Sequence, residues 1–358
     1  MSYSIAVVPG DGIGTEVVSG TVSVLDTLAS IHGFELEKTD YELGAEFFLE
    51  HGQVMKDGTM DALRTHDAVL LGAVGHPDVN NAYVAAEGHH RIRREFDLWA
   101  NLRPAVLYAD HVSPLDGYQS GEIDILWFRE NSEGAYLDMG GKLQRNGETE
   151  MALQCAAYTR KGIERIARAA FDAAREREGI VHTITKSNVL SYGSTFWDEV
   201  VAAVADEYPA VTLEHLYVDA ANLRIVTQPE LFDVVVAPNL FSDILTDATA
   251  GVVGGLGLAP SSNVNLTDPD IPGMFEPVHG TAPDIAGEGT ANPLASVLSG
   301  GLLLEDLGEN AAATHLEDTV RAQLQDLDAP RTPDLGGDTT TTAVIKDLEK
   351  RLQSSCPY

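Results

Sequence analysis

The chain has 358 residues, of which 44% are hydrophobic, so it is long enough for two domains with substantial cores. Its 55 acidic and 23 basic residues give a net charge of −32, and a surface of that sign would repel nucleic acids and anionic membranes. No apolar stretch reaches the roughly 18 residues that would span a membrane, and the N-terminus lacks a signal-peptide pattern. We therefore expect a cytoplasmic protein that binds neither nucleic acid nor membranes.

The excess of acidic residues predicts a halophilic protein. Lysine is scarce, and a strongly acidic surface suits concentrated salt, where a Debye length of about 3 Å at 1 M weakens self-repulsion. The two cysteines, Cys155 and Cys356, are far apart and have none of the close spacings of metal or redox sites. We interpret them as ordinary residues.

The first motif is VVPGDGIGTEVV at residues 7–18, in which Gly10, Gly12 and Gly14 are spaced one residue too tightly for the dinucleotide fingerprint. The apolar run 5–8 predicts a strand before this glycine turn, and apolar residues at helical spacing after it predict a helix. The turn is therefore a strand-to-helix connection whose chemistry stays open.

Later segments repeat this alternation of strands and helices. Apolar runs at 68–71, 123–128 and 232–236 predict strands buried on both faces, whereas 211–218 alternates and predicts a strand with one wetter face. Residues 159–179 predict an amphipathic helix that Gly179 ends. This order indicates an α/β fold with a mainly parallel sheet, with domain crossings at proline- and glycine-rich turns.

An arginine cluster occupies residues 89–104 and includes Arg91, Arg93, Arg94 and Arg103. Guanidinium groups bind carboxylates bidentately, so the cluster is either a carboxylate site or a helix face paired with surrounding acids. Arg129 favours the first interpretation, because it ends a buried strand and open α/β sheets bind ligands at the carboxyl ends of their strands.

Three aspartates form a candidate metal site. Asp243 and Asp247 lie four residues apart on a predicted helix, and Asp219 follows a predicted strand. Three carboxylates would suit Mg²⁺ or Mn²⁺, although so acidic a chain contains such pairs by chance.

Four further residues have both a functional and an ordinary interpretation. Lys186 ends a strand and is either a general base or a surface lysine; Tyr136 is either a general acid or a core aromatic. His279 either stacks on a base or satisfies a loop, and Asp284 is an acid of the type that binds a ribose diol.

Six segments, in order along the chain, resemble the metal-dependent β-decarboxylating dehydrogenases that oxidise isopropylmalate, isocitrate, homoisocitrate, D-malate or tartrate: GDGIG, RREFDLWANLRP, RENSEGAY, TKSN, NLFSDILTD and FEPVHGTAPDIAGEGTANP. The resemblance implies an isopropylmalate-dehydrogenase-like two-domain α/β fold with a central mixed sheet, and not a Rossmann fold. Residues 1–100 and 255–358 would form a discontinuous cofactor-side domain, and residues 101–254 the dimerisation, substrate and metal domain.

The resemblance also implies a role for each motif residue: Tyr136 and Lys186 catalytic, Arg93, Arg103 and Arg129 substrate-binding, Asp219, Asp243 and Asp247 metal-binding, and Ile13, Asn188, His279, Gly280, Thr281, Ala282, Asp284 and Asn292 cofactor-binding. It implies a homodimer in which Lys186 and Asp219 of one subunit complete the site of the other. The cofactors would be Mg²⁺ or Mn²⁺ and NAD, which is preferred to NADP because a carboxylate at Asp284 would repel a 2'-phosphate.

The substrate is ranked from the helix before Arg93. Glu87 and His89 stand where isocitrate enzymes have Ser and Asn, and His89 and His90 replace the leucines that often receive an isopropyl group. A polar pocket favours hydrogen or hydroxyl at C3, so D-malate or tartrate ranks first and 3-isopropylmalate second. A catalytically silent regulatory relative is the rival from another class, and it is disfavoured because every role residue is present.

Overall fold

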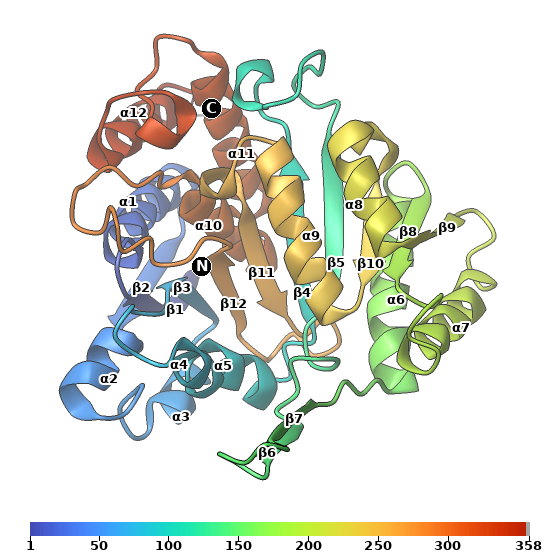
Figure 1. Cartoon of the computed structure of the whole chain (residues 1–358). Coiled ribbons are helices and arrows are strands. Elements are labelled where there is room, and N and C mark those ends of the chain that lie inside the picture. Colours follow the sequence, from blue (N-terminus) through green and yellow to red (C-terminus); the bar gives the residue numbers. More distant parts are fainter. Residues whose placement is uncertain (356–358) are drawn as a thin grey trace.

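One ten-stranded sheet runs through the computed structural model, which describes residues 1–355 (Figure 1). Its order is β2-β1-β3-β12-β11-β4-β5-β10-β8-β9. β11 is antiparallel to both of its neighbours, β4 is antiparallel to β5, and the other pairs are parallel. The sheet is therefore mixed, as expected. The strands are β1 (Ser2–Gly10), β2 (Glu35–Asp40), β3 (Ala68–Ala73), β4 (Ala100–Val106), β5 (Asp124–Glu130), β8 (Ile180–Thr185), β9 (Thr212–Tyr217), β10 (Val234–Ala237), β11 (Pro260–Val264) and β12 (Gly273–Pro277).

Helices cover both faces of the sheet, and a separate hairpin of β6 (Gly140–Leu143) and β7 (Met151–Gln154) projects from one end of the molecule (Figure 1). The α-helices are α1 (Gly14–His32), α2 (Ala45–His51), α3 (Thr59–Leu63), α4 (Asn81–Glu87), α5 (His89–Glu95), α6 (Arg160–Arg175), α7 (Gly193–Ala205), α8 (Val218–Thr227), α9 (Asn239–Val252), α10 (Leu294–Asp306), α11 (Asn310–Gln325) and α12 (Thr341–Ser354). Short 3₁₀ turns are η1 (Asp110–Val112), η2 (Pro229–Leu231), η3 (Leu256–Leu258) and η4 (Pro333–Leu335).

The predicted elements are confirmed, with small shifts at strand ends and a shorter helix at 159–179. The apolar runs lie in β1, β3, β5 and β10, and 211–218 becomes β9, a mostly exposed edge strand. The predicted helix at 159–179 is α6, which Thr159 caps at Gly162 N but which ends at Arg175. The backbone leaves the helical conformation at Glu176, and Arg177 beyond it pairs with Asp233.

Alternate side chains of each strand pack against different helices. On one face, residues such as Val7 of β1 join a large cluster with α1, α6, α7, α10, α11 and α12. The other face has two smaller apolar clusters, one where Val8 packs with α2 to α5 and one where Trp127 packs with α8 and α9. Between these two clusters lie β12, β11 and β4, and their buried side chains on this face are largely polar.

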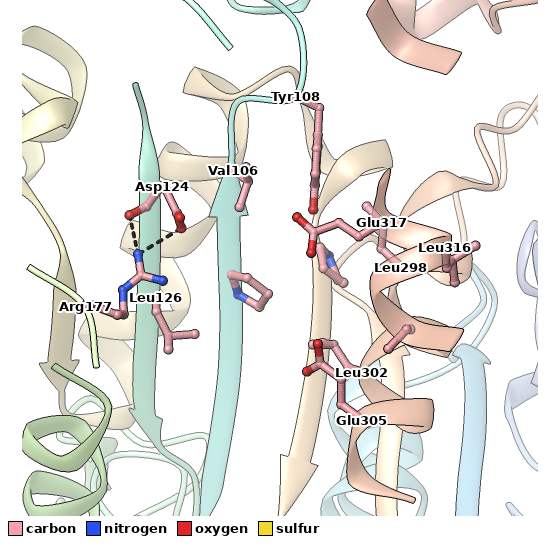
Figure 2. A pocket seen from close by; sticks show the side chains of 14 residues that line it. Val106, Tyr108, Asp124, Leu126, Arg177, Leu298, Leu302, Glu305, Leu316 and Glu317 are labelled. Atoms are coloured by element: carbon pink, nitrogen blue, oxygen red, sulfur yellow. Dashed lines mark hydrogen bonds and ion pairs between the residues drawn. The ribbon is translucent and has the colours of Figure 1, made fainter. Parts of the chain in front are cut away.

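A cavity of about 210 Å³, called the second cavity below, lies on the face of β4 and β5 that the large cluster covers (Figure 2). Val106 and Leu126 line it from the strands, and Glu305 and Glu317 from α10 and α11. The arginine that lines it, Arg177, is already neutralised by two aspartates. This cavity therefore lacks the free positive charge that a carboxylate ligand needs.

The glycines of the GDGIG turn serve close packing. Gly10 has a φ of +72°, and a Cβ on it would lie 2.0 Å from the carbonyl oxygen of Ala73. A Cβ on Gly12 would lie 2.3 Å from the carbonyl oxygen of Thr281, which accepts a hydrogen bond from Ile13 N. The turn thus rests directly on the loop that contains Thr281.

The predicted boundary between the two domains falls between β11 and β4. These strands are hydrogen-bonded neighbours in one sheet, so the sheet continues across the boundary and the domain division stays a prediction. Cys155 is a free, exposed cysteine, and Cys356 lies outside the described residues. Among residues 1–355, no helix has both the length and the apolarity to cross a membrane.

Candidate active site

The three predicted substrate arginines meet in one cavity of about 330 Å³. Arg93 comes from α5, Arg103 from β4 and Arg129 from β5, and each is at most 8% exposed. The cavity lies between the two smaller apolar clusters. Its lining comprises Gly72, Ala73, Val74, His89, His90, Arg93, Arg103, Arg129, Tyr136, Asp243, Ser261, Glu276, Pro277, Val278, His279 and Gly280.

The arginine-rich segment contains examples of both interpretations, the carboxylate site and the helix face that pairs with surrounding acids. Arg91 pairs with Glu87 and Glu95 on the surface of α5, as the helix-face interpretation predicts. Arg93 and Arg103 instead point into the cavity. Burial and the charge of a neighbouring guanidinium lower the pKa of Arg103 to about 9, so it remains a cation at neutral pH.

Some N–H groups of these arginines donate hydrogen bonds to protein atoms, whereas one has no partner in the described residues. The Nε and Nη2 atoms of Arg129 donate to Asn239 Oδ1 at 2.9 and 2.8 Å, and its Nη1 donates to Asp243. Arg93 Nε is buried and has no hydrogen-bond partner within residues 1–355. A buried donor without a partner beside two other cations fits an anionic ligand.

Asp243 and Asp247 lie one turn apart on α9 and face the arginines. Arg103 Nη2 donates to Asp243 Oδ1 at 3.4 Å, and Arg103 Nη1 lies 3.9 Å from Asp247 Oδ1. Burial alone would raise the pKa of Asp243, but Arg129 and the hydroxyl of Tyr136 outweigh it and lower that pKa. Burial raises the pKa of Asp247. Two neighbouring carboxylates are the kind of ligands that a hard cation takes together with several water molecules.

Tyr136 lines the arginine cavity and is not buried in the core, so its interpretation as a core aromatic is wrong. It lies in the loop after β5, its side chain is partly exposed, and its hydroxyl donates to Asp243 Oδ2. Burial and this hydrogen bond raise the pKa of Tyr136 to about 12, so it carries its proton at neutral pH. The ring of His90 packs edge-on against it at 5.8 Å between centroids.

Lys186, Asn188 and Asp219 form a separate group within one chain. Lys186 follows β8 and Asp219 lies in the first turn of α8, and the two side chains form an ion pair. Asn188 is exposed in the turn after Lys186. In the part of the chain that the structure describes, no three His, Cys, Asp or Glu side chains could hold a metal ion, so Asp219 does not join Asp243 and Asp247 in one subunit.

Part of the predicted cofactor set lines a neighbouring cavity of about 440 Å³. Ile13, His279 and Asn292 line it together with Ile285 and Ala291. His279 Nε2 is buried without a partner in the described chain, and burial lowers the pKa of this histidine. A mainly apolar cavity with one free imidazole nitrogen fits the flat ring of a nucleotide.

The remaining cofactor residues lie beside these two cavities. Gly280 lines the arginine cavity, Thr281 contacts Ile13, and Ala282 has a φ of +39° that turns the loop. Asp284 is exposed and lines neither cavity, but it directly precedes Ile285, which lines the apolar one, so its role stays a prediction. Asp334, which accepts from Asn292 Nδ2 at 2.9 Å, lines the apolar cavity instead.

Sequence reasoning missed several polar residues beneath the arginines. Asn101, Asn263 and Glu276 lie on β4, β11 and β12, and Thr246 accepts from Arg103 Nη1 at 2.6 Å. Polar residues inside otherwise buried strands were the available signal, because such groups are costly to bury without a partner.

Residues 4–348 match the isocitrate/isopropylmalate dehydrogenase family. The chain belongs to this family. It is 46% identical over 98% of both chains to a protein of Thermobifida fusca (strain YX) named 3-isopropylmalate dehydrogenase. It is 40% identical, again over 98% of both chains, to the probable tartrate dehydrogenase/decarboxylase of Bacillus subtilis (strain 168). The crystal structure of isocitrate dehydrogenase from Methylococcus capsulatus superposes with a TM-score of 0.89 at 33% identity, covering 98% of this chain and 99% of that one.

Membership in the isocitrate/isopropylmalate dehydrogenase family confirms the predicted fold and excludes a Rossmann domain. It also makes the chain an enzyme, a dehydrogenase that acts on a hydroxy acid with decarboxylation. The roles of individual residues stay predictions, now with a known arrangement in space.

Proposed function

We propose that the protein catalyses the NAD- and divalent-cation-dependent oxidative decarboxylation of a (2R)-hydroxy acid with a carboxylate on C3. The observation that supports this best is the convergence of three buried guanidinium groups beside a pair of aspartates. Three cations can hold two carboxylates of a substrate, and two carboxylates can hold a cation next to them.

Asp243 and Asp247 would hold Mg²⁺ or Mn²⁺, which when bound polarises the substrate oxygens and stabilises developing negative charge. The apolar cavity that Ile13, His279 and Asn292 line would receive the adenosine end of NAD, which accepts the hydride when bound. The arginines orient the carboxylates, and Tyr136, protonated at neutral pH, can donate its proton to C3.

Lys186 of one subunit would act in the active site of its partner, where it would accept the proton of the substrate hydroxyl. In one chain it lies with Asp219, apart from Tyr136 and Asp243. Two exposed apolar side chains on α8, Leu223 and Val226, and two on α9, Leu240 and Ile244, support a dimer through these helices. The same two helices include Asp219 and Asp243, so their pairing could join the two groups.

We now rank 3-isopropylmalate first among the substrates, which reverses the ranking derived from the sequence. The reason is that the relative with 46% identity is named 3-isopropylmalate dehydrogenase. D-malate or tartrate remains the second candidate for a specific reason. His89 and His90 line the cavity, and burial, with the charge of Arg93, lowers their pKa values to about 3 and about 2. They are thus neutral hydrogen-bonding groups where an apolar substituent would need an apolar wall.

An assay of NADH formation at 340 nm separates these candidates. The purified protein would be given 3-isopropylmalate, D-malate, tartrate, isocitrate and homoisocitrate in turn, with Mn²⁺ and either NAD or NADP. We expect NAD-dependent turnover that EDTA abolishes. Replacing both histidines, in His89→Leu with His90→Leu, should raise kcat/KM for 3-isopropylmalate relative to tartrate. Absence of NADH formation with all five acids would refute the proposed function.

A further inference from the structure

Two arginines of the cavity are joined by an unbroken chain of buried hydrogen bonds. At one end Arg93 Nη2 donates to Glu276 Oε1. Asn263 Nδ2 donates to the same oxygen at 2.9 Å. Asn101 Nδ2 donates to Asn263 Oδ1 at 3.1 Å. At the other end Arg103 Nε donates to Asn101 Oδ1 at 2.8 Å.

The sheet fixes the distances between the side chains of this hydrogen-bond chain. Glu276, Asn263 and Asn101 lie on β12, β11 and β4, which are neighbouring strands. Asn263 and Asn101 are direct partners in the register of β11 and β4. Side chains of directly opposed residues on one face lie within contact distance, so the backbone ladder sets where each link can be.

Both amide groups have a single possible orientation. Asn263 Nδ2 also donates to the carbonyl of Met274 at 3.1 Å, and its Oδ1 also accepts from Asn131 Nδ2 at 2.9 Å. Asn101 Nδ2 also donates to the carbonyl of Ser262 at 3.0 Å. Both asparagines are fully buried, so rotating either amide by half a turn would set donors against donors without water to relieve them.

The hydrogen-bond chain uses one donor of each arginine, Nη2 of Arg93 and Nε of Arg103. Arg93 still has its buried, unpartnered Nε, and Arg103 Nη1 and Nη2 point to Thr246 and Asp243 beside the cavity. Burial would raise the pKa of Glu276, but Arg93 and Asn263 outweigh this effect and lower it, so its carboxylate stays ionised.

Apolar side chains would fill the same space between strands without the desolvation cost of three polar groups. We infer that Glu276, Asn263 and Asn101 are positioning residues that hold Arg93 and Arg103 at the separation needed to bind two carboxylates of one substrate. This inference rests on the proposed function, because it concerns the same arginines, but it assigns a role to residues outside the predicted set.

The test uses malonate, a dicarboxylate without a reacting hydroxyl, and the full-length protein. Calorimetry would measure malonate affinity of the wild type, Asn101→Leu, Asn263→Leu and the double variant. We expect each single change to weaken malonate binding and raise the substrate KM about tenfold, as for loss of one hydrogen bond to a charged group. The double variant should bind malonate only slightly more weakly than either single variant, because both substitutions break the same chain of hydrogen bonds. The kcat and the affinity for NAD should change little.

Asn131→Leu is the matched control. Asn131 is also buried and donates to the same Asn263 oxygen, but its other partner is the carbonyl of Leu98, and it forms no hydrogen bond with either arginine side chain. It should lower stability and leave malonate affinity unchanged. Equal losses of affinity in Asn131→Leu, or additive losses in the double variant, would overturn the inference.

If the leucine variants do not fold, Asn101→Ser and Asn263→Ser remove the amide groups without adding bulk or charge, and should give the same order of malonate affinities. A wild type that binds malonate but oxidises no hydroxy acid would refute the proposed function and leave the positioning test valid. A wild type that binds no malonate would overturn both.

Discussion

The hydroxyl of Tyr136 donates a hydrogen bond to Asp243 Oδ2, so the proposed proton donor is bonded directly to a proposed cation ligand. Both groups also lie next to Arg129, whose guanidinium is 5.3 Å from the ring centroid of Tyr136. A cation bound by Asp243 would therefore weaken the attraction between Asp243 and the tyrosine proton. In the proposed mechanism, this arrangement would couple occupation of the metal site to proton donation.

Tyr136→Phe tests that role. We expect kcat to fall by about 10² to 10⁴, the usual contribution of a positioned proton donor, with little change in substrate KM. Steady-state kinetics at 340 nm measure both. Tyr108→Phe is the control, because Tyr108 is a buried tyrosine that lines the second cavity on the other face of the sheet and should retain full activity (Figure 2). Equal loss in the two variants would contradict a proton-donating role.

Asp247→Asn and Asp243→Asn should both weaken Mn²⁺ binding, measured by calorimetry or electron paramagnetic resonance. They should differ in stability. Asp243 offsets the buried charge of Arg129, so its loss should lower the free energy of unfolding by about 2 kcal/mol, whereas Asp247 is more exposed and only 3.9 Å from Arg103. Mn²⁺ affinity that neither substitution alters would exclude these aspartates as ligands.

A shared active site predicts complementation between two inactive variants. Lys186→Met and Tyr136→Phe should each be inactive alone. When they are refolded together, each mixed dimer should contain one intact site, and random pairing should restore about a quarter of wild-type activity. Ile244→Asp, which places a charge on the exposed apolar face of α9, should instead give monomers by light scattering. Active monomers would contradict the proposal.

His89 and His90 predict a specific loss of stability in mild acid. Their pKa values, lowered mainly by burial, are about 3 and about 2, below the ordinary value of 6.5. The unfolded chain therefore takes up protons below about pH 6.5 that the folded chain does not. As the pH is lowered from about 6.5 to about 3, the free energy of unfolding should therefore decrease, by up to about 1.4 kcal/mol per pH unit for each histidine.

Denaturant unfolding between pH 7 and pH 5, with EDTA present, measures this slope. The double variant with His89→Gln and His90→Gln should have a flatter slope than the wild type in the same window. Identical slopes would show that these histidines are protonated in the folded protein.

Concentrated salt should stabilise the protein. With a net charge of −32, mutual repulsion of the surface acids opposes folding in dilute buffer, and molar salt screens it to about 3 Å. The thermal unfolding midpoint should rise between dilute buffer and molar KCl. Sucrose of equal osmolality, which screens no charge, should have a smaller effect. A midpoint that KCl does not raise would refute the halophilic interpretation.

Short-range patterns in the sequence determined the elements of this protein and the groups that could react. Buried runs such as 232–236 and the amphipathic pattern of α6 are recognisable locally, because burial repeats with the period of a strand or a helix. The order of six motifs was sufficient for the family. The carboxyl end of β5 predicted a ligand-facing position for Arg129, and the structure places this side chain in the wall of a cavity.

Only the tertiary structure decided which of these groups lie together. It brought Tyr136 to Asp243 across 107 positions and Arg93 to Glu276 across 183, and it left Asp284 exposed. The polar chain from Glu276 to Asn101 exists because β12, β11 and β4 are neighbours in the sheet, although they are distant in sequence. Strand order depends on the packing of the whole chain, so local patterns cannot specify it.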